Sequence, residues 1–310
     1  MASTPPQDWR EVLIVEAALR TGLLAAFLTP ASPAAVAARL DLDARATRVT
    51  ALALADLGYL TPAGAGVLAA APAALGLIDE RGEERDAAAR IHVTARLIAQ
   101  HARLGDALLG AAPVPPWRGD RGLAEFTAAM RATAGERVGE LVEALTRPHD
   151  GARLLDIGGG PGVDAAALAG AGWDVTVLDL PEVLAATGGR LAEDGVRAVA
   201  GDATAHVPSG PWDAILIANV LQLLGPDRAS ALVARAVAEL APDGVLGVLG
   251  IVRDLSPHGR LFAVGMLLST DEGDTHESED ITGWIRAAGL QDVAVAEFSG
   301  GRILMTGRAA

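Results

Sequence analysis

A glycine-rich loop in the middle of the chain constrains the fold most strongly. Residues 154–162 read LLDIGGGPG, and an Ala-rich run follows them. An apolar run that leads into glycines and then into such a segment predicts a strand, a tight loop and a helix N-terminus. Glycines allow a ligand close to the backbone, and the helix N-terminus adds unpaired N–H groups. The sequence therefore predicts a small-molecule cofactor site at the carboxyl end of a strand in an open α/β sheet.

Two common nucleotide-binding loops are excluded, one by the spacing of these glycines and the other by the absence of lysine. A dinucleotide fingerprint that starts at Gly158 and Gly160 needs its third glycine at Val163, but the glycine is Gly162. The loop is therefore G-x-G-x-G preceded by Asp156. A phosphate-binding P-loop needs a lysine, and the chain contains none.

Acidic residues follow the next two predicted strands. Residues 175–178 are β-branched or apolar and end at Asp179, where a carboxylate can accept hydrogen bonds from ribose hydroxyls. Residues 196–200 lead to Asp202, which we expect near an adenine amino group. Residues 212–219 and 245–252 give two more strands. Residues 293–298 and 303–307 are expected to pair as a final hairpin.

Five segments carry a resemblance to a known family. In chain order they are LLDIGGGPG, LDLPEV, GDATAHVP, WDAILIANVLQLL and LAPDGVLGVLG. They resemble S-adenosylmethionine-dependent methyltransferases, and more narrowly the small-molecule O-methyltransferases with an N-terminal winged-helix dimerisation domain. The resemblance extends over nearly the whole chain. It implies an α/β fold with a Rossmann-like sheet of seven strands, mostly parallel with an antiparallel last strand. It also implies S-adenosylmethionine as cofactor, a small-molecule substrate and a homodimer.

The resemblance also implies site residues. For the cofactor they are Asp156, Gly158, Gly160, Gly162, Asp179, Leu180, Asp202, Ala203, Ala218 and Asn219. For a small, largely apolar acceptor they are Phe126, Met130, Gln222, Phe262 and Met266. Phe126 and Met130 stand four residues apart, so they could equally form a core face of one helix.

The histidine that serves as general base in the resembled O-methyltransferases is missing. It belongs to a pattern like L-H-D-W after the fourth strand, where this chain has Leu221-Gln222-Leu223-Leu224. Glutamine cannot take a proton. In one explanation another residue is the base. His276 is the first candidate, although its acidic segment could be only a solvated loop, and His258 is the second. In a second, the acceptor needs no base and Gln222 orients it. In a third, the enzyme catalyses a cyclisation or rearrangement without methyl transfer.

We expect three regions along the chain. Residues 1–85 contain predicted helices at 8–28, 34–40 and 44–57 and two short strands, an arrangement that resembles a winged helix. Residues 86–150 form a helical linker that contributes to the substrate pocket, and 151–310 form the cofactor-binding domain. Ser32 and Asp43 are expected to cap the second and third helices.

The composition limits which kinds of binding partner the protein can have. The net charge of −14 opposes binding to nucleic acid, which requires a basic face. Arg45 and Arg48 would suit a ligand-sensing winged-helix regulator, the alternative from another functional class, but acidic residues surround them. The chain contains no cysteine, and neither a membrane span nor a secretory leader is visible, so we expect a cytoplasmic protein. No metal site is expected, because the acidic segment around His276 lacks the spacing of a calcium loop.

Overall fold

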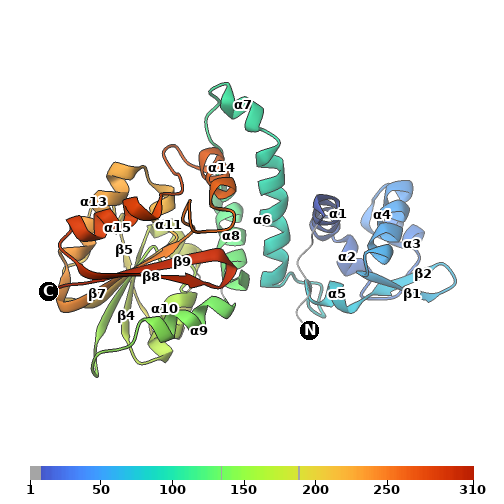
Figure 1. Cartoon of the computed structure of the whole chain (residues 1–310). Coiled ribbons are helices and arrows are strands. Elements are labelled where there is room, and N and C mark those ends of the chain that lie inside the picture. Colours follow the sequence, from blue (N-terminus) through green and yellow to red (C-terminus); the bar gives the residue numbers. More distant parts are fainter. Residues whose placement is uncertain (1–7, 134, 188) are drawn as a thin grey trace. The chain divides into compact units, whose positions relative to one another are not determined.

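The chain divides into two compact units (Figure 1). The computed structural model describes residues 8–133, 135–187 and 189–310. The first unit extends to residue 102 and includes residues 128–132, and the second contains residues 103–127 and 133–310. No helix in the described part of the chain combines the length and the apolar character needed to cross a bilayer.

The first unit is mostly helical. Its elements are α1 (Trp9–Arg20), α2 (Leu23–Ala26), α3 (Pro33–Leu40), α4 (Ala44–Asp56), β1 (Leu60–Gly64), β2 (Val67–Ala70), α5 (Pro72–Leu75) and α6 (Asp86–His101). The predicted single helix over 8–28 is wrong, because the chain turns at Gly22, whose φ of 72° is left-handed. The predicted caps are confirmed: Ser32 accepts the N–H of Ala35 at 3.2 Å, and Asp43 accepts that of Ala46 at 2.6 Å.

The two short strands of this unit pair as predicted. β1 and β2 are antiparallel, with Leu60 opposite Ala70. The core beneath them holds the fully buried side chains of Leu24, Phe27 and Leu54. The succession of α3, α4 and a two-stranded sheet is the order of elements in a winged helix.

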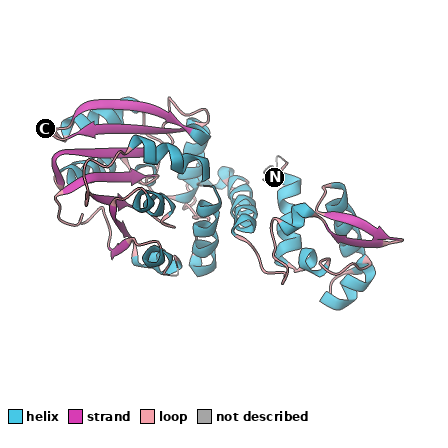
Figure 2. Ribbon diagram, turned by 90° about the horizontal axis from the view of Figure 1, so that it is seen from below, coloured by secondary structure: helices cyan, strands magenta, loops and turns pink. Residues whose placement is uncertain are grey.

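The second unit contains a seven-stranded sheet. Its strands are β3 (Arg153–Ile157), β4 (Asp174–Asp179), β5 (Arg197–Ala200), β6 (Trp212–Ala218), β7 (Leu240–Gly250), β8 (Gln291–Phe298) and β9 (Arg302–Arg308). The strand order is β5-β4-β3-β6-β7-β9-β8, and only β9 runs against its neighbours. The predicted mostly parallel sheet with an antiparallel last strand is confirmed. Figure 2 shows the sheet from below.

The second unit also contains the helices α7 (Leu104–Leu108), α8 (Gly119–Thr133, whose residues 128–132 belong to the first unit), α9 (Gly135–Ala144), α10 (Val163–Gly170), α11 (Pro181–Ala186), α12 (Arg190–Glu193), α13 (Pro226–Val237), α14 (Gly259–Ser269) and α15 (Ser278–Ala287). Two short 3₁₀ turns, η1 (Leu221–Leu223) and η2 (Ser299–Gly301), complete the unit.

The alternation of side chains along β3 explains the two layers. Leu155 and Ile157 belong to a buried cluster with residues of α13 and α15, whereas Leu154 belongs to one with residues of α9 and α10. Successive strand residues point to opposite faces, so an apolar run that fills both faces specifies a sheet buried on both sides. Figure 1 shows α13 and α15 on one side of the sheet and α9 and α10 on the other.

The strand order places a crevice at β3. The chain moves from β3 outward to β4 and β5, and then returns to place β6 on the other side of β3. Such a reversal opens a crevice at the carboxyl ends of the strands, where open α/β sheets bind their ligands. The glycine loop starts in this crevice.

Candidate functional site

The backbone of the glycine loop requires glycine. Gly158, Gly160 and Gly162 have φ angles of 71°, 51° and 76°, a left-handed conformation that residues with a Cβ rarely adopt. A Cβ at Gly158 would overlap Val220 Cγ2, and one at Gly162 would overlap Leu191 Cδ2. The loop is thus closely packed between β3 and α10 at these two glycines, whereas a Cβ at Gly160 would meet only the Gly158 carbonyl oxygen, at 3.9 Å.

Asp179 faces this loop from the end of β4. Its Oδ2 accepts the N–H of Gly160 at 2.8 Å, and its Oδ1 accepts the N–H of Leu180 at 2.7 Å. Burial raises the pKa of Asp179, although both hydrogen bonds act in the opposite direction. Leu180 is exposed beside it. The structure therefore brings two predicted cofactor residues, Asp179 and Gly160, into direct contact.

Asp156 lies beneath the loop. Its side chain is fully buried, and neither carboxylate oxygen has a hydrogen-bond partner among the described residues. Burial raises the pKa of Asp156 well above its usual value; the charges of Asp164 and Asp179 add to this, and Arg137 opposes it. A Cβ at Gly159 would come within 2.6 Å of Asp156 Oδ2. Asp156 thus supports the loop from below.

Arg137 is a member of this buried group that sequence reasoning missed. From α9, its Nη1 pairs with Asp164 Oδ2 at 2.6 Å, and both side chains are about nine-tenths buried. Asp164 lies in the first turn of α10. No sequence motif marks Arg137, because only the packing of α9 on α10 brings it under the glycine loop.

The loop after β5 is tied to that after β4. Gly201 N–H donates to the Asp179 carbonyl at 2.9 Å. Asp202 Oδ1 accepts both the N–H and the hydroxyl of Thr204, at 2.8 and 2.7 Å, and these bonds lower the pKa of Asp202. Ala203 directly follows. The exposed carboxylate of Asp202 is therefore ionised and held at the rim of the crevice.

The chain turns sharply after β6. Ala218 ends the strand, and Asn219 has a φ of 58°, a conformation that Asn tolerates better than most residues. Its N–H donates to Leu249 at 2.7 Å. The turn leads into η1, which carries Gln222. Gln222 is buried, and its Oε1 accepts the N–H of Ile251 at 3.4 Å.

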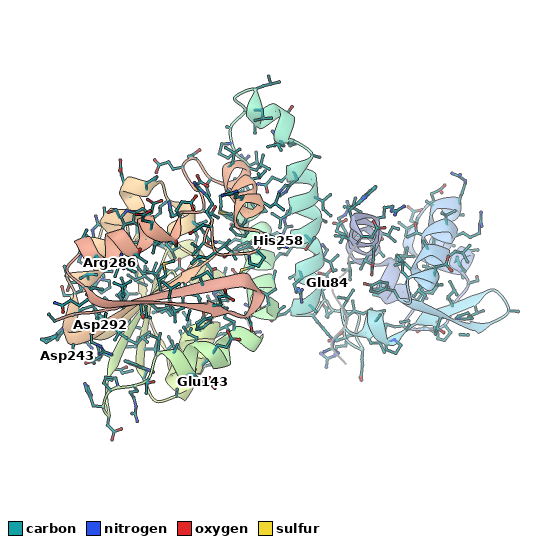
Figure 3. The ribbon with its side chains drawn as sticks, in the orientation of Figure 1. Glu84, Glu143, Asp243, His258, Arg286 and Asp292 are labelled. Atoms are coloured by element: carbon teal, nitrogen blue, oxygen red, sulfur yellow. The ribbon has the colours of Figure 1, made fainter. Side chains whose placement is uncertain are left out.

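The two histidine candidates differ in their surroundings. His276 is buried, its Nε2 is bonded to the Leu221 carbonyl at 3.0 Å, and its ring meets Trp284 edge-on at 4.8 Å. His258 is exposed at the start of α14 (Figure 3). His276 is therefore held by the backbone of η1, whereas His258 faces solvent.

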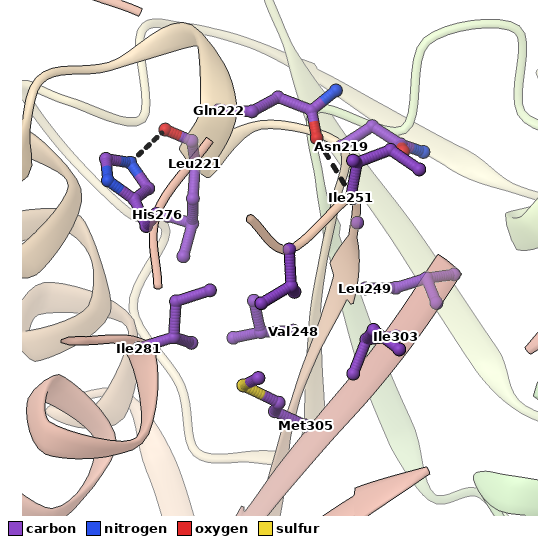
Figure 4. Close-up of a pocket in the computed structure, with 12 residues that line it drawn as sticks. Asn219, Leu221, Gln222, Val248, Leu249, Ile251, His276, Ile281, Ile303 and Met305 are labelled. Carbon is purple, nitrogen blue, oxygen red and sulfur yellow. Dashed lines mark hydrogen bonds between the residues drawn. The ribbon is translucent and has the colours of Figure 1, made fainter. Parts of the chain in front are cut away.

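A small pocket opens at the ends of β6 and β7 (Figure 4). It is lined by Asn219, Leu221, Gln222, Val248, Leu249, Gly250, Ile251, Val252, His276, Ile281, Ile303 and Met305. Of the predicted site residues it brings together Asn219, Gln222 and His276. Most of the remaining lining is apolar.

The other predicted substrate residues do not line this pocket. On α14, Phe262 is partly exposed and Met266 is buried. Phe126 packs against Trp117, with ring centroids 5.1 Å apart. Phe126 belongs to the second unit and Met130 to the first.

A comparison with protein families decides the class of this domain. Residues 154–244 match the family model described as "Methyltransferase domain". This segment is similar to methyltransferase domains. It runs from β3 into β7, and it therefore includes the glycine loop, Asp179, Asp202 and Gln222.

Solved structures resemble the chain over almost its full length. PigF, solved with SAH, is 22% identical, with a TM-score of 0.82 over 97% of this chain and 96% of its own. An O-methyltransferase family protein from Burkholderia thailandensis is 20% identical, with a TM-score of 0.84 over 98% and 96%. Human N-acetylserotonin methyltransferase in complex with SAM is 18% identical, with a TM-score of 0.78 over 100% of both. At these identities the likeness establishes the fold. No curated protein matches the sequence significantly.

Proposed function

We propose that this protein transfers a methyl group from S-adenosylmethionine to a small, largely apolar metabolite, with oxygen as the favoured acceptor atom. The observation that carries the proposal is the contact between Asp179 and Gly160 at the carboxyl ends of β3 and β4, within a methyltransferase domain. The left-handed glycines provide the close cradle that such a cofactor requires. PigF with SAH and the human enzyme with SAM have the same fold.

The cofactor residues have distinct roles in this proposal. Gly158, Gly160 and Gly162 receive the cofactor against the backbone, and Asp179 accepts hydrogen bonds from the ribose hydroxyls. The segment Asp202–Ala203 holds the adenine, and Leu180 covers one side of it. Ala218 and Asn219 close the crevice from β6. Asp156, the remaining predicted cofactor residue, supports the loop at the end of β3.

Positioning supplies most of the catalysis. When bound, S-adenosylmethionine supplies a methyl group already activated by its sulfonium charge. The chain's own residues must align the acceptor with that methyl group and exclude water, which can lower the barrier by several kcal/mol. Gln222, Phe262 and Met266 orient the acceptor, together with Phe126 and Met130 from α8. His258 and His276 are the candidate bases for an acceptor that needs one.

The assembly and the domain limits belong to the same proposal. We place the limits at residues 1–85, 86–150 and 151–310, with the first region forming a winged-helix homodimer interface. The acidic chain acts in the cytoplasm without nucleic acid. In a gel-shift assay at low salt, slower migration of any DNA duplex in the presence of the protein would favour the alternative of a ligand-sensing regulator.

Calorimetry with S-adenosylmethionine tests the cofactor assignment. We expect saturable binding to the wild type and weaker binding to Asp179→Ala. No heat of binding at millimolar cofactor would reject the proposal. An unchanged dissociation constant for Asp179→Ala would remove Asp179 from the site.

A second candidate function has one observation in its favour. Gln222 occupies the position of the family's base, so the chain could use its bound cofactor for a cyclisation or rearrangement. Product mass separates the two reactions, because transfer adds one methylene unit and rearrangement adds none.

A further inference from the structure

Gln222 offers the pocket a hydrogen-bond donor and no proton acceptor. Its Oε1 accepts the N–H of Ile251 at 3.4 Å. The amide nitrogen of the same carboxamide therefore lies on the side away from Ile251, as Figure 4 shows. An amide NH₂ only donates hydrogen bonds. A substrate atom that meets the Gln222 amide nitrogen must therefore be a hydrogen-bond acceptor.

The acidic segment before α15 is used by the protein itself. Asp274 pairs with Arg253 at 2.5 Å, and Glu277 caps α15 while lying 3.8 Å from the same arginine. Glu272 reaches Arg228 at 3.5 Å. These three carboxylates are ion-paired within the protein, and none of them lines the pocket.

His276 is held by the backbone of η1 through one of its two ring nitrogens. A carbonyl can only accept, so the bond to Leu221 at 3.0 Å requires His276 Nε2 to carry the hydrogen. Trp284 packs edge-on against the ring. Figure 4 places His276 on the opposite side of Leu221 from the Gln222 carboxamide. His276 therefore positions η1, and through it Gln222.

We propose that the acceptor is an oxygen acid that is already ionised at neutral pH: an acidic phenol, an enol or a carboxylic acid. This inference rests on the proposed function, and it specifies the substrate class of the same site. The amide N–H of Gln222 donates to the anionic oxygen. An oxygen–carbon bond forms while the carbon–sulfur bond breaks, and the electron pair of that bond goes to sulfur. Anion and sulfonium become two neutral products, and no proton is transferred.

In this scheme the ionisation of the acceptor in solution decides which acceptors react. An ordinary phenol has a pKa of about 10, so only about one molecule in a thousand is ionised at pH 7. An enzyme without a base would therefore discriminate strongly against it. A phenol that ionises near neutral pH would react without help from the protein.

The pH dependence of methyl transfer to probe acceptors tests the inference. We would measure kcat/KM against pH for 4-nitrophenol, pentafluorophenol, phenol and benzylamine. For the two acidic phenols we expect the profile to bend at the solution pKa of each acceptor. A bend at one common pH for both would show a base on the protein and overturn the inference. Faster transfer to phenol or benzylamine, or no transfer to any probe while S-adenosylmethionine still binds, would also overturn it.

Variants of Gln222 separate its role from folding. Gln222→Met keeps the shape and removes the donor, so we expect kcat/KM for 4-nitrophenol to fall about tenfold, as for one lost hydrogen bond to a charged group. Gln222→His should add a bend near pH 6.5, the ordinary pKa of histidine, and make phenol an acceptor. Calorimetry should show cofactor binding within about twofold of wild type in both variants. Full activity in Gln222→Met would overturn the inference. It would also be overturned if His258→Ala removed the bend in the pH profile for the acidic phenols, because His258 would then be the base. Failure of the wild type to bind the cofactor would instead reject the proposed function.

Discussion

The carboxylate of Asp179 accepts the backbone N–H of Gly160 at 2.8 Å, and this bond joins the ends of two parallel strands across the crevice. The parallel register of β3 and β4 places Ile157 beside Leu178 and so makes the contact possible. Contacts within the protein thereby organise the crevice. Three predictions concern this crevice and the buried charges around it, and a fourth concerns Tyr59 in the first unit.

Replacing Asp179 should weaken cofactor binding. Asp179→Ala removes a charged acceptor for ribose hydroxyls, so we expect the binding free energy to fall by about 1–3 kcal/mol. Isothermal calorimetry with S-adenosylmethionine measures the change. Asp174→Ala is the matched control, because Asp174 starts the same strand and pairs with Arg197 at the far end. Equal losses in the two variants would show a general effect on β4.

Adding a side-chain methyl group to the glycine loop should lower both the stability of the fold and the affinity for the cofactor. Gly158→Ala forces an alanine into a φ of 71° and into contact with Val220. We expect the free energy of unfolding to fall by about 1–3 kcal/mol, with cofactor binding lost in parallel. Gly170→Ala is the control, since a Cβ there meets open space at the end of a helix. It should leave stability unchanged or raise it by about 0.5–1 kcal/mol, the usual helix preference for Ala. Thermal and urea unfolding would measure both variants.

Asp156 should make the stability depend on pH. Its pKa is raised in the folded protein by burial and by Asp164 and Asp179, against the effect of Arg137. The native state therefore binds a proton that the unfolded state has released, so its contribution to stability falls as pH rises above about 4, the pKa of an unfolded Asp. Asp156→Asn removes this dependence. We expect the difference in unfolding free energy between variant and wild type to shift in favour of the variant from pH 4 to pH 8. A constant difference would contradict the raised pKa.

Tyr59 gives a test in the first unit. It is the only tyrosine of the chain, so its ionisation can be followed directly by ultraviolet absorbance. Burial, together with its hydrogen bond to Glu11 at 3.1 Å, raises its pKa to about 12. The folded protein should therefore keep this phenol neutral up to a higher pH than the unfolded chain does. Its contribution to stability should be complete below pH 10, the pKa of an unfolded tyrosine, and be lost above it. Titration near pH 10 in the folded state would contradict the buried hydrogen bond. Glu11→Gln should lower the pKa of Tyr59 while leaving its burial intact.

The sequence by itself determined the strands, the loop and the order of elements. Their signals are local: apolar runs such as residues 154–157, glycines where φ is positive, and capping side chains such as Ser32 and Asp43. The same signals located Asp179, because an acid at the end of a predicted parallel strand must lie at the ligand edge of the sheet. The break at Gly22 was missed, since a glycine inside an amphipathic pattern does not reveal its φ.

Only the tertiary structure decided which side chains are free to do chemistry. Residues far apart in the chain make those contacts: Arg137 with Asp164, Arg253 with Asp274, and His276 with the carbonyl of Leu221. The sequence presented His276 as a candidate base in an acidic loop. Packing buries it against Trp284, and its Nε2 is bonded to the backbone beside Gln222. Partners that depend on how helices and loops pack leave no periodic trace in the sequence, whereas backbone conformation and strand burial do.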